Sequence, residues 1–150
     1  MSLLKHCIKL SAPLFNCSFS STTRLSNIYY TKDHETIQTD SNTNIVKLGI
    51  SDYAKEKLGD IVFLEPELEQ DDTFEEGDIL VSIESVKATS DIEAPFNGKI
   101  VDVNEIENVE SITTMTEEEL WFISCEINDA SILNGFMSEI EYTQFVSKKE

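Results

Sequence analysis

Residues that build disulfides and metal sites are scarce in this sequence. Its 150 residues include only three cysteines and two histidines, and Cys7 and Cys17 both lie within the first 26 residues. Removal of that segment would leave Cys125 alone, which excludes an intramolecular disulfide. The cysteines and histidines also lack the close spacing of zinc ligands, so we expect no metal centre.

Long apolar runs and positive charge are also missing. No stretch approaches the roughly 18 apolar residues that a membrane-spanning helix needs, so we expect no membrane association of that kind. The chain carries 29 acidic residues against 11 lysines and arginines, for a formal net charge of −18. Such a field repels phosphate backbones, so nucleic acid is not an expected partner, and basic protein surfaces are favoured instead.

The first 26 residues differ in composition from the rest of the chain. They contain no acidic residue, three basic residues and eight serines and threonines. This composition is typical of an organelle transit peptide, so we predict that residues 1–26 are a cleaved leader and that residues 27–150 work in the mitochondrial matrix or a related organelle. A secretory signal and a disordered tail are the alternatives, although Lys9 and Pro13 interrupt the apolar core of a secretory signal.

The centre of the chain has the pattern of β-strands. Ile79, Val81 and Ile83 recur at period two, and similar short apolar runs predict strands near 45–50, 61–64, 78–84, 92–96, 99–103 and 120–127. The Asn97-Gly98 pair predicts a hairpin between the fourth and fifth of these runs. Several short strands separated by turns predict a mostly β fold, either a sandwich or a flattened barrel.

Helices are expected to be few and short. Ser51 and Gly59 occupy cap positions around a helix predicted over 52–58. Thr116 with Glu119, and Ser138 with Glu141, have capping-box spacing, the first for a single turn and the second for a C-terminal helix. Residues 27–44 are polar and predict turns, except for an apolar patch around residues 28–30 where the fold is expected to begin.

Lys87 lies between two predicted strands, in the segment Glu84-Ser85-Val86-Lys87-Ala88-Thr89-Ser90-Asp91. We expect it at a tight turn between antiparallel strands, where a modifying enzyme reaches the ε-amine on a backbone that is held still. Small neighbours leave the approach open, and Glu84 and Asp91 supply charges for a ligase to recognise. An ordinary surface lysine fits the same local pattern, so these residues alone leave both interpretations open.

The sequence around Lys87 resembles the lipoylation motif of the glycine cleavage H-proteins. Other blocks resemble the same family in the same order, and they lie at 30–35, 49–54, 58–63, 92–95, 98–104, Trp121 and 141–145. The resemblance therefore runs over residues 30–146. It implies the fold of lipoyl and biotinyl carriers, a barrel-sandwich hybrid with short helices that include a C-terminal one.

The resemblance implies a carrier and not an enzyme, with no catalytic residue of its own. Lipoate would be joined to Lys87 by a lipoate ligase or lipoyltransferase, with Glu84 as the stronger recognition residue and Asp91 as the weaker one. The carrier would take an aminomethyl group from glycine decarboxylase to a tetrahydrofolate-dependent aminomethyltransferase. Dihydrolipoamide dehydrogenase would then reoxidise it. The other cofactors of the system belong to these partners.

The sequence departs from the family pattern in three places. Thr36 follows the His34-Glu35 pair where the family usually has tryptophan, Pro66 lies in a redrawn loop, and residues 115–120 replace a Gly-rich approach to the last strand. These changes leave the lysine segment intact but alter where partners would dock. Two other functions stay open: a lipoyl donor for 2-oxoacid dehydrogenase complexes, and an unmodified H-like scaffold.

Several residues with chemical potential have a structural interpretation. His34 has no nucleophile or metal-ligand partner in its motif, and Trp121 and Cys125 are expected in the core. The acidic run at 117–119 is expected to be a solvated turn.

Overall fold

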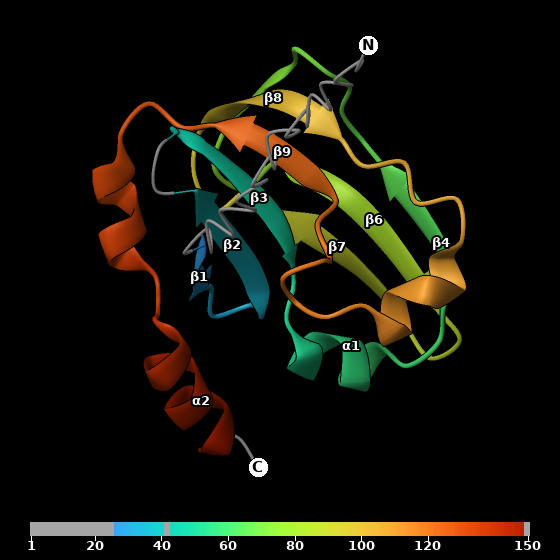
Figure 1. Ribbon diagram of the computed structural model, residues 1–150. Helices are drawn as coiled ribbons and strands as arrows, with labels where there is room; N and C mark the ends of the chain where they lie inside the picture. Colours follow the sequence, from blue (N-terminus) through green and yellow to red (C-terminus); the bar gives the residue numbers. More distant parts are fainter. Residues whose placement is uncertain (1–25, 41–42, 149–150) are drawn as a thin grey trace, which may run out of the picture.

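Two β-sheets form the body of the molecule, a computed structural model that describes residues 26–40 and 43–148 (Figure 1). One sheet has six strands in the order β1-β2-β3-β9-β8-β5, and the other has three in the order β4-β6-β7. All paired neighbours are antiparallel. The strands are β1 (Ser26–Tyr30), β2 (Glu35–Asp40), β3 (Ile45–Ile50), β4 (Ile61–Pro66), β5 (Thr73–Phe74), β6 (Ile79–Ser85), β7 (Thr89–Glu93), β8 (Gly98–Val103) and β9 (Ile123–Glu126).

Four short helices connect or cover these strands. They are α1 (Asp52–Leu58), the 3-10 helices η1 (Val109–Thr114) and η2 (Ala130–Gly135), and α2 (Glu139–Ser147) at the C-terminal end. The mostly β fold with a C-terminal helix is therefore confirmed. None of the helices in the described residues is long and apolar enough to cross a membrane. The predicted leader lies outside the described residues, apart from Ser26.

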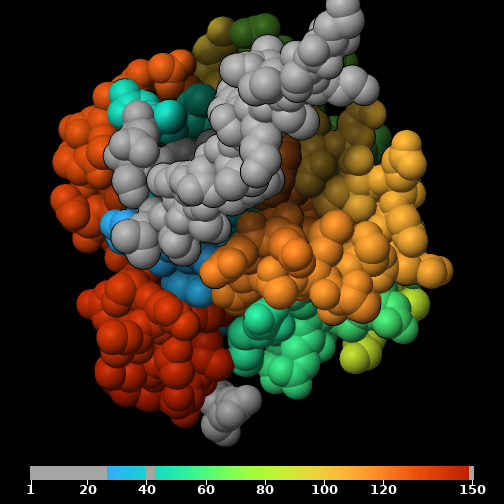
Figure 2. All heavy atoms as spheres, in the orientation of Figure 1, coloured from blue at the N-terminus to red at the C-terminus, as the bar shows by residue number. Residues whose placement is uncertain are grey.

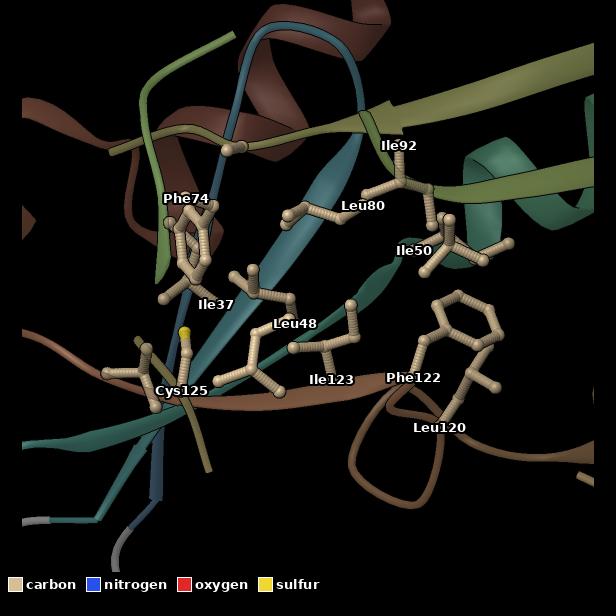
Figure 3. Close-up of a cluster of buried hydrophobic side chains, with 14 of the residues drawn as sticks. Ile37, Leu48, Ile50, Phe74, Leu80, Ile92, Leu120, Phe122, Ile123 and Cys125 are labelled. Carbon is tan, nitrogen blue, oxygen red and sulfur yellow. The ribbon is translucent and has the colours of Figure 1, made fainter. Parts of the chain in front are cut away.

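The core fills the space between the two sheets (Figure 3). Leu48 and Ile123 reach it from the six-stranded sheet and Leu80 from the three-stranded sheet, and all three side chains are at most 2% exposed. Each buried aliphatic side chain contributes about 1.5–3 kcal/mol to the stability of the fold. Cys125 is also buried here as predicted, and its burial raises the pKa of the thiol to about 12.

Helix α1 forms where its caps predicted. The hydroxyl of Ser51 accepts a hydrogen bond of 3.2 Å from the backbone N–H of Ala54, which satisfies a donor that the first turn would leave unpaired. Gly59 ends the helix with a φ of 74°, a left-handed value that glycine adopts without steric cost. The helix thus starts and stops for local reasons.

The predicted hairpin at Asn97-Gly98 is wrong. Strand β7 pairs with β6 in one sheet, whereas β8 pairs with β5 and β9 in the other, so the chain passes between sheets here. The side-chain oxygen of Asn97 accepts a hydrogen bond of 2.7 Å from the N–H of Glu76. A Cβ built on Gly98 would lie 2.8 Å from the ring of Phe74. The glycine therefore allows a close approach and does not form a tight turn.

The fold begins at the apolar patch around residues 28–30, as expected, because this patch lies in β1, but the polar residues after it form a second strand where turns were expected. β1 and β2 pair with each other, and β2 also pairs with β3. Polar Gln38 is buried in β2 because its amide donates to the carbonyl oxygens of Glu117 and Leu120. These partners lie 79 and 82 residues later in the chain, so the local sequence pattern does not reveal the strand.

The C-terminal third follows the capping signals closely. Residues 116–120 form one hydrogen-bonded turn, in which the carboxylate of Glu119 accepts from the N–H of Thr116. The last strand is shorter than the predicted 120–127. At the start of α2, the carboxylate of Glu141 accepts hydrogen bonds from both the N–H and the hydroxyl of Ser138, which confirms the predicted C-terminal helix.

Candidate functional site

Lys87 lies at a tight turn between β6 and β7, as the sequence predicts. The N–H of Ser85 donates a 2.8 Å hydrogen bond to the carbonyl oxygen of Ala88, which closes the turn. The hydroxyl oxygen of Ser85 also accepts from the N–H groups of Lys87 and Ala88, at 3.2 and 3.0 Å. One serine side chain thus fixes the backbone that presents the exposed lysine.

The end of α1 supports this turn from the side, at the same end of the molecule (Figure 1). The N–H of Val86 donates to the carbonyl oxygen of Asp60 at 3.0 Å. A Cβ built on Gly59 would lie 3.2 Å from Nζ of Lys87 and 3.3 Å from its Cε. The lysine stem therefore lies over Gly59, a position that only glycine fills without crowding it.

The two acidic residues near the lysine have different surroundings. Glu84 is exposed and pairs across β4 and β7 with Phe63 and Thr89, and Phe63 itself is 46% exposed. Asp91 lies farther along β7, opposite Ser82, whose hydroxyl is 2.9 Å from the Asp91 carboxylate. Glu84 is therefore next to the turn, whereas Asp91 is set back from it.

A cavity of about 180 Å³ lies beside the lysine turn. Leu58, which precedes the glycine under the Lys87 stem, forms part of its wall. The cavity is lined by the turn between β1 and β2 with the start of β2, by the end of β3, by helix α1, and by the β6–β7 pair. Its apolar residues are Ile50, Ala54, Leu58, Ile83 and Ile92, and its polar ones are Asp33, His34, Glu35, Tyr53, Lys57, Ser90 and Asp91. An open groove of about 780 Å³ shares five of the polar residues.

Glu35 is a buried residue of the cavity wall that sequence reasoning did not single out. Its side chain is 7% exposed, with the carboxylate accepting a 2.8 Å hydrogen bond from the Thr31 hydroxyl and a 3.2 Å bond from the N–H of Glu93. Burial raises the pKa of this carboxyl, and the two hydrogen bonds offset part of that rise. Recognising β2 would have revealed Glu35, because it shares a strand face with buried Ile37 at period two.

His34 contacts aromatic side chains from both α-helices. Its backbone is left-handed, with a φ of 73°, at the turn between β1 and β2. Nδ1 is 2.8 Å from the hydroxyl oxygen of Tyr142 on α2, and the ring centroid is 4.6 Å from that of Tyr53. The imidazole therefore lies between the cavity, α1 and α2.

Two expectations about the C-terminal third need correction. Trp121 is only partly buried, because its ring lies under the Lys47 ammonium, 4.6 Å from the centroid, and does not enter the core. Glu117 is not a solvated turn residue: its carboxylate accepts a 2.6 Å hydrogen bond from the Tyr30 hydroxyl and another from the N–H of Asp52. The segment that departs from the family pattern thus ties β1 to α1.

A departure at Thr36 has a visible structural consequence. The side chain is fully buried, and its hydroxyl has no hydrogen-bond partner among the residues that the structure describes. Within the same residues, no three histidine, cysteine or acidic side chains come together as a metal site would require.

Known proteins resemble this chain in sequence and in fold. The family model described as glycine cleavage H-protein matches residues 28–149. The glycine cleavage system H proteins of Staphylococcus epidermidis and Staphylococcus saprophyticus are each 38% identical, over 125 and 126 residues, covering 82% of this chain and 97% of theirs. The crystal structure of a glycine cleavage system H protein from Mycobacterium marinum superposes with a TM-score of 0.67 at 27% identity, covering 82% of this chain and 96% of that one. Because the family model matches residues 28–149 and the relatives align over most of the chain, the chain belongs to the glycine cleavage H-protein family.

Proposed function

We propose that the protein is a carrier without catalytic residues of its own, and that Lys87 holds lipoate through an amide bond to Nζ. When attached, lipoate supplies a reversible thiol–disulfide pair on a flexible arm. The function is transport of an aminomethyl group from glycine decarboxylase to the tetrahydrofolate-dependent aminomethyltransferase, with dihydrolipoamide dehydrogenase completing the cycle. Tethering suits this task because it gives the carried group a high effective concentration at each partner.

The observation that carries the proposal is the construction of the Lys87 turn. Ser85 holds the turn backbone with three hydrogen bonds, and Val86 is tied to Asp60. The lysine stem projects over a glycine that leaves room for it. An enzyme acylating Nζ meets an exposed amine on a backbone that does not have to be ordered first, which lowers the cost of recognition.

The cavity beside the turn is suited to receive the arm. Its walls include five aliphatic side chains, and Leu58 connects it to the glycine beneath Lys87. Each CH₂ group buried there contributes about 0.8 kcal/mol, so a short chain docks reversibly and remains able to leave for a partner. The carboxylates of Glu35 and Asp91 at the same cavity favour a positively charged amine at the end of the arm.

Glu84 is the residue we assign to recognition by the lipoate ligase or lipoyltransferase, with Asp91 in a secondary role. Glu84 is exposed beside the turn and next to exposed Phe63, so a basic and partly apolar enzyme surface fits both side chains. Asp91 accepts a hydrogen bond from Ser82 and lies farther from the lysine.

The acid-free composition of residues 1–26 supports a cleaved leader and a mitochondrial matrix location.

A modification assay tests the attachment site. Full-length protein is incubated with lipoate, ATP and a lipoate ligase, and the product is analysed by intact and peptide mass. We expect one lipoyl increment on the peptide that contains Lys87 and none on Lys87→Arg. Lys57→Arg is the matched control, because Lys57 is another exposed lysine beside the same cavity, and it should be modified like the native protein. Modification elsewhere, or none, would contradict the proposal.

A further inference from the structure

One hydroxyl on the C-terminal helix joins two walls of the arm cavity. The Tyr142 oxygen lies 2.8 Å from Nδ1 of His34 and 2.7 Å from the hydroxyl oxygen of Ser51. Tyr142 is buried, with 7% of its surface exposed. Among the residues that the structure describes, those that line the 180 Å³ cavity include none from α2. Whatever Tyr142 does for the cavity, it therefore does through these two neighbours.

The two neighbours belong to different walls. His34 lies in the turn between β1 and β2, directly before the buried carboxylate of Glu35. Ser51 caps α1, the helix that supplies Tyr53 and Leu58 to the wall of the cavity. A 2.9 Å hydrogen bond from the Ser51 N–H to the His34 carbonyl oxygen already joins the backbones, and Tyr142 adds a bridge between the side chains.

Independent contacts fix the position of the Tyr142 hydroxyl. Its ring stacks on Tyr30, with centroids 4.3 Å apart and planes inclined by 7°. The backbone of Tyr30 exchanges two hydrogen bonds, of 2.9 and 3.0 Å, with Met137 immediately before the helix. Figure 2 shows the result, with α2 (red) lying against β1 (blue) and α1 (green). The helix is therefore held in register with β1 before the hydroxyl makes its own bonds.

The three polar groups allow two orders of hydrogen-bond donation. A hydroxyl has one hydrogen to donate, so the Tyr142 oxygen donates to one neighbour and accepts from the other. If Ser51 donates to Tyr142, Tyr142 donates to Nδ1 of His34 and the neutral ring carries its proton on Nε2. If His34 donates from Nδ1, Tyr142 donates to Ser51. The two orders place the ring proton on different nitrogens, so the order that forms sets the tautomer of the imidazole beside the cavity.

We propose that Tyr142 is a positioning residue for the lipoyl arm, holding the β1–β2 turn and α1 at the separation that the arm cavity requires. The C-terminal helix then stabilises the cavity from outside, through Tyr142, although no described residue of this helix lines it. This inference rests on the proposed function, because it concerns the cavity that we assign to the arm of Lys87.

Tyr142→Phe is the decisive variant, since it keeps the buried ring and its stack on Tyr30 but removes the bridging oxygen. Two signals are recorded by NMR on the full-length protein: the ¹⁵N shifts of the His34 ring, and the chemical-shift changes that lipoylation causes at Leu58, Ile83 and Ile92. We expect the variant to lose the tautomer preference of His34 and most of the lipoyl-dependent shifts. Mass analysis should show the same lipoylation of Lys87 as in the native protein.

Two further variants keep the test sharp. Tyr30→Phe removes the neighbouring hydroxyl, which bonds to Glu117, and preserves the stack, so both NMR signals should match those of the native protein. Ser51→Ala cuts the bridge at its other end and should reproduce the loss of the His34 tautomer preference. Thermal unfolding of each variant shows that the native fold is retained at the measurement temperature.

The possible failures are distinguishable. If Tyr142→Phe keeps both the His34 tautomer and the lipoyl-dependent shifts, the positioning role is refuted while the proposed function stands. If lipoylated native protein shows no shifts at the cavity residues, the cavity is not the site of the arm and the inference is overturned. If native Lys87 accepts no lipoate, the proposed function itself fails.

Discussion

The lysine turn and the cavity beside it are built on different principles. The turn is local: most of its hydrogen bonds join residues within 85–88, and it is supported from outside by Gly59 and Asp60. The cavity is assembled from distant segments, with Glu35 receiving a bond from the backbone of Glu93 and His34 contacting Tyr142. A local turn tolerates change elsewhere in the chain, whereas the cavity depends on the packing of the whole domain.

The largest expected effect is the loss of stability when a buried side chain is shortened, and it allows a cavity residue to be compared with a core residue outside the cavity. Ile83 and Leu80 are both fully buried on β6, but only Ile83 lines the cavity. Ile83→Ala and Leu80→Ala should each lower the free energy of unfolding by about 2–5 kcal/mol, measured by denaturant titration. Only Ile83→Ala should also change the lipoyl-dependent chemical shifts at Leu58. Equal changes in both variants would remove the distinction between cavity and core.

A smaller loss of stability is expected when a left-handed glycine is replaced by alanine, and two such glycines differ in whether they contact the lysine. Gly59 and Gly77 both have left-handed backbones, with φ values of 74° and 93°, and a Cβ on Gly77 would meet nothing within 4 Å. Alanine at either position should cost about 1–2 kcal/mol in the free energy of unfolding, because the left-handed region disfavours a side chain. Gly59→Ala alone should slow ligase-catalysed lipoylation, since its Cβ crowds the Lys87 stem. The assay compares initial lipoylation rates of the two variants.

The smallest expected effect is the pH dependence contributed by Glu35. Burial raises the pKa of this carboxyl in the folded protein, so the folded state binds the proton more tightly than the unfolded state does. The stability from this group is present below its ordinary pKa and is lost as the pH rises through the raised value. Glu35→Gln should therefore flatten the decline in the free energy of unfolding from acid to neutral pH. Exposed Glu84→Gln is the control, and a flattening of the same size there would contradict the assignment.

The same contrast explains what the sequence could predict. The β6–β7 turn and α1 were predicted because the signals lie within a few residues, in the period-two isoleucines and in Ser51 and Gly59 as caps. Strand β2 escaped prediction because buried Gln38 is satisfied by carbonyl oxygens from the 117–120 turn. Tertiary partners of this kind override a polar local pattern, which is why buried polar residues were assigned to turns.

Two of the errors about single residues also come from contacts between distant segments. Gly98 suggested a hairpin, but its role is to let Phe74 approach closely from the neighbouring strand β5, which is separated from Gly98 in the sequence by β6 and β7. Glu117 suggested a solvated acid, but the Tyr30 hydroxyl donates to it from 87 residues away. The candidate site was half predictable for this reason: the attachment lysine follows from local sequence, and the cavity that would receive its arm does not.

Attachment of lipoate to Lys87 is best tested by peptide mass analysis of the protein purified from its native cells. We expect a lipoyl increment on the peptide that contains Lys87, in a chain that begins near residue 27, and no increment on that peptide in Lys87→Arg. An unmodified Lys87 in cells replete with lipoate would contradict the carrier function and favour an acidic scaffold that binds its partners without a lipoyl arm.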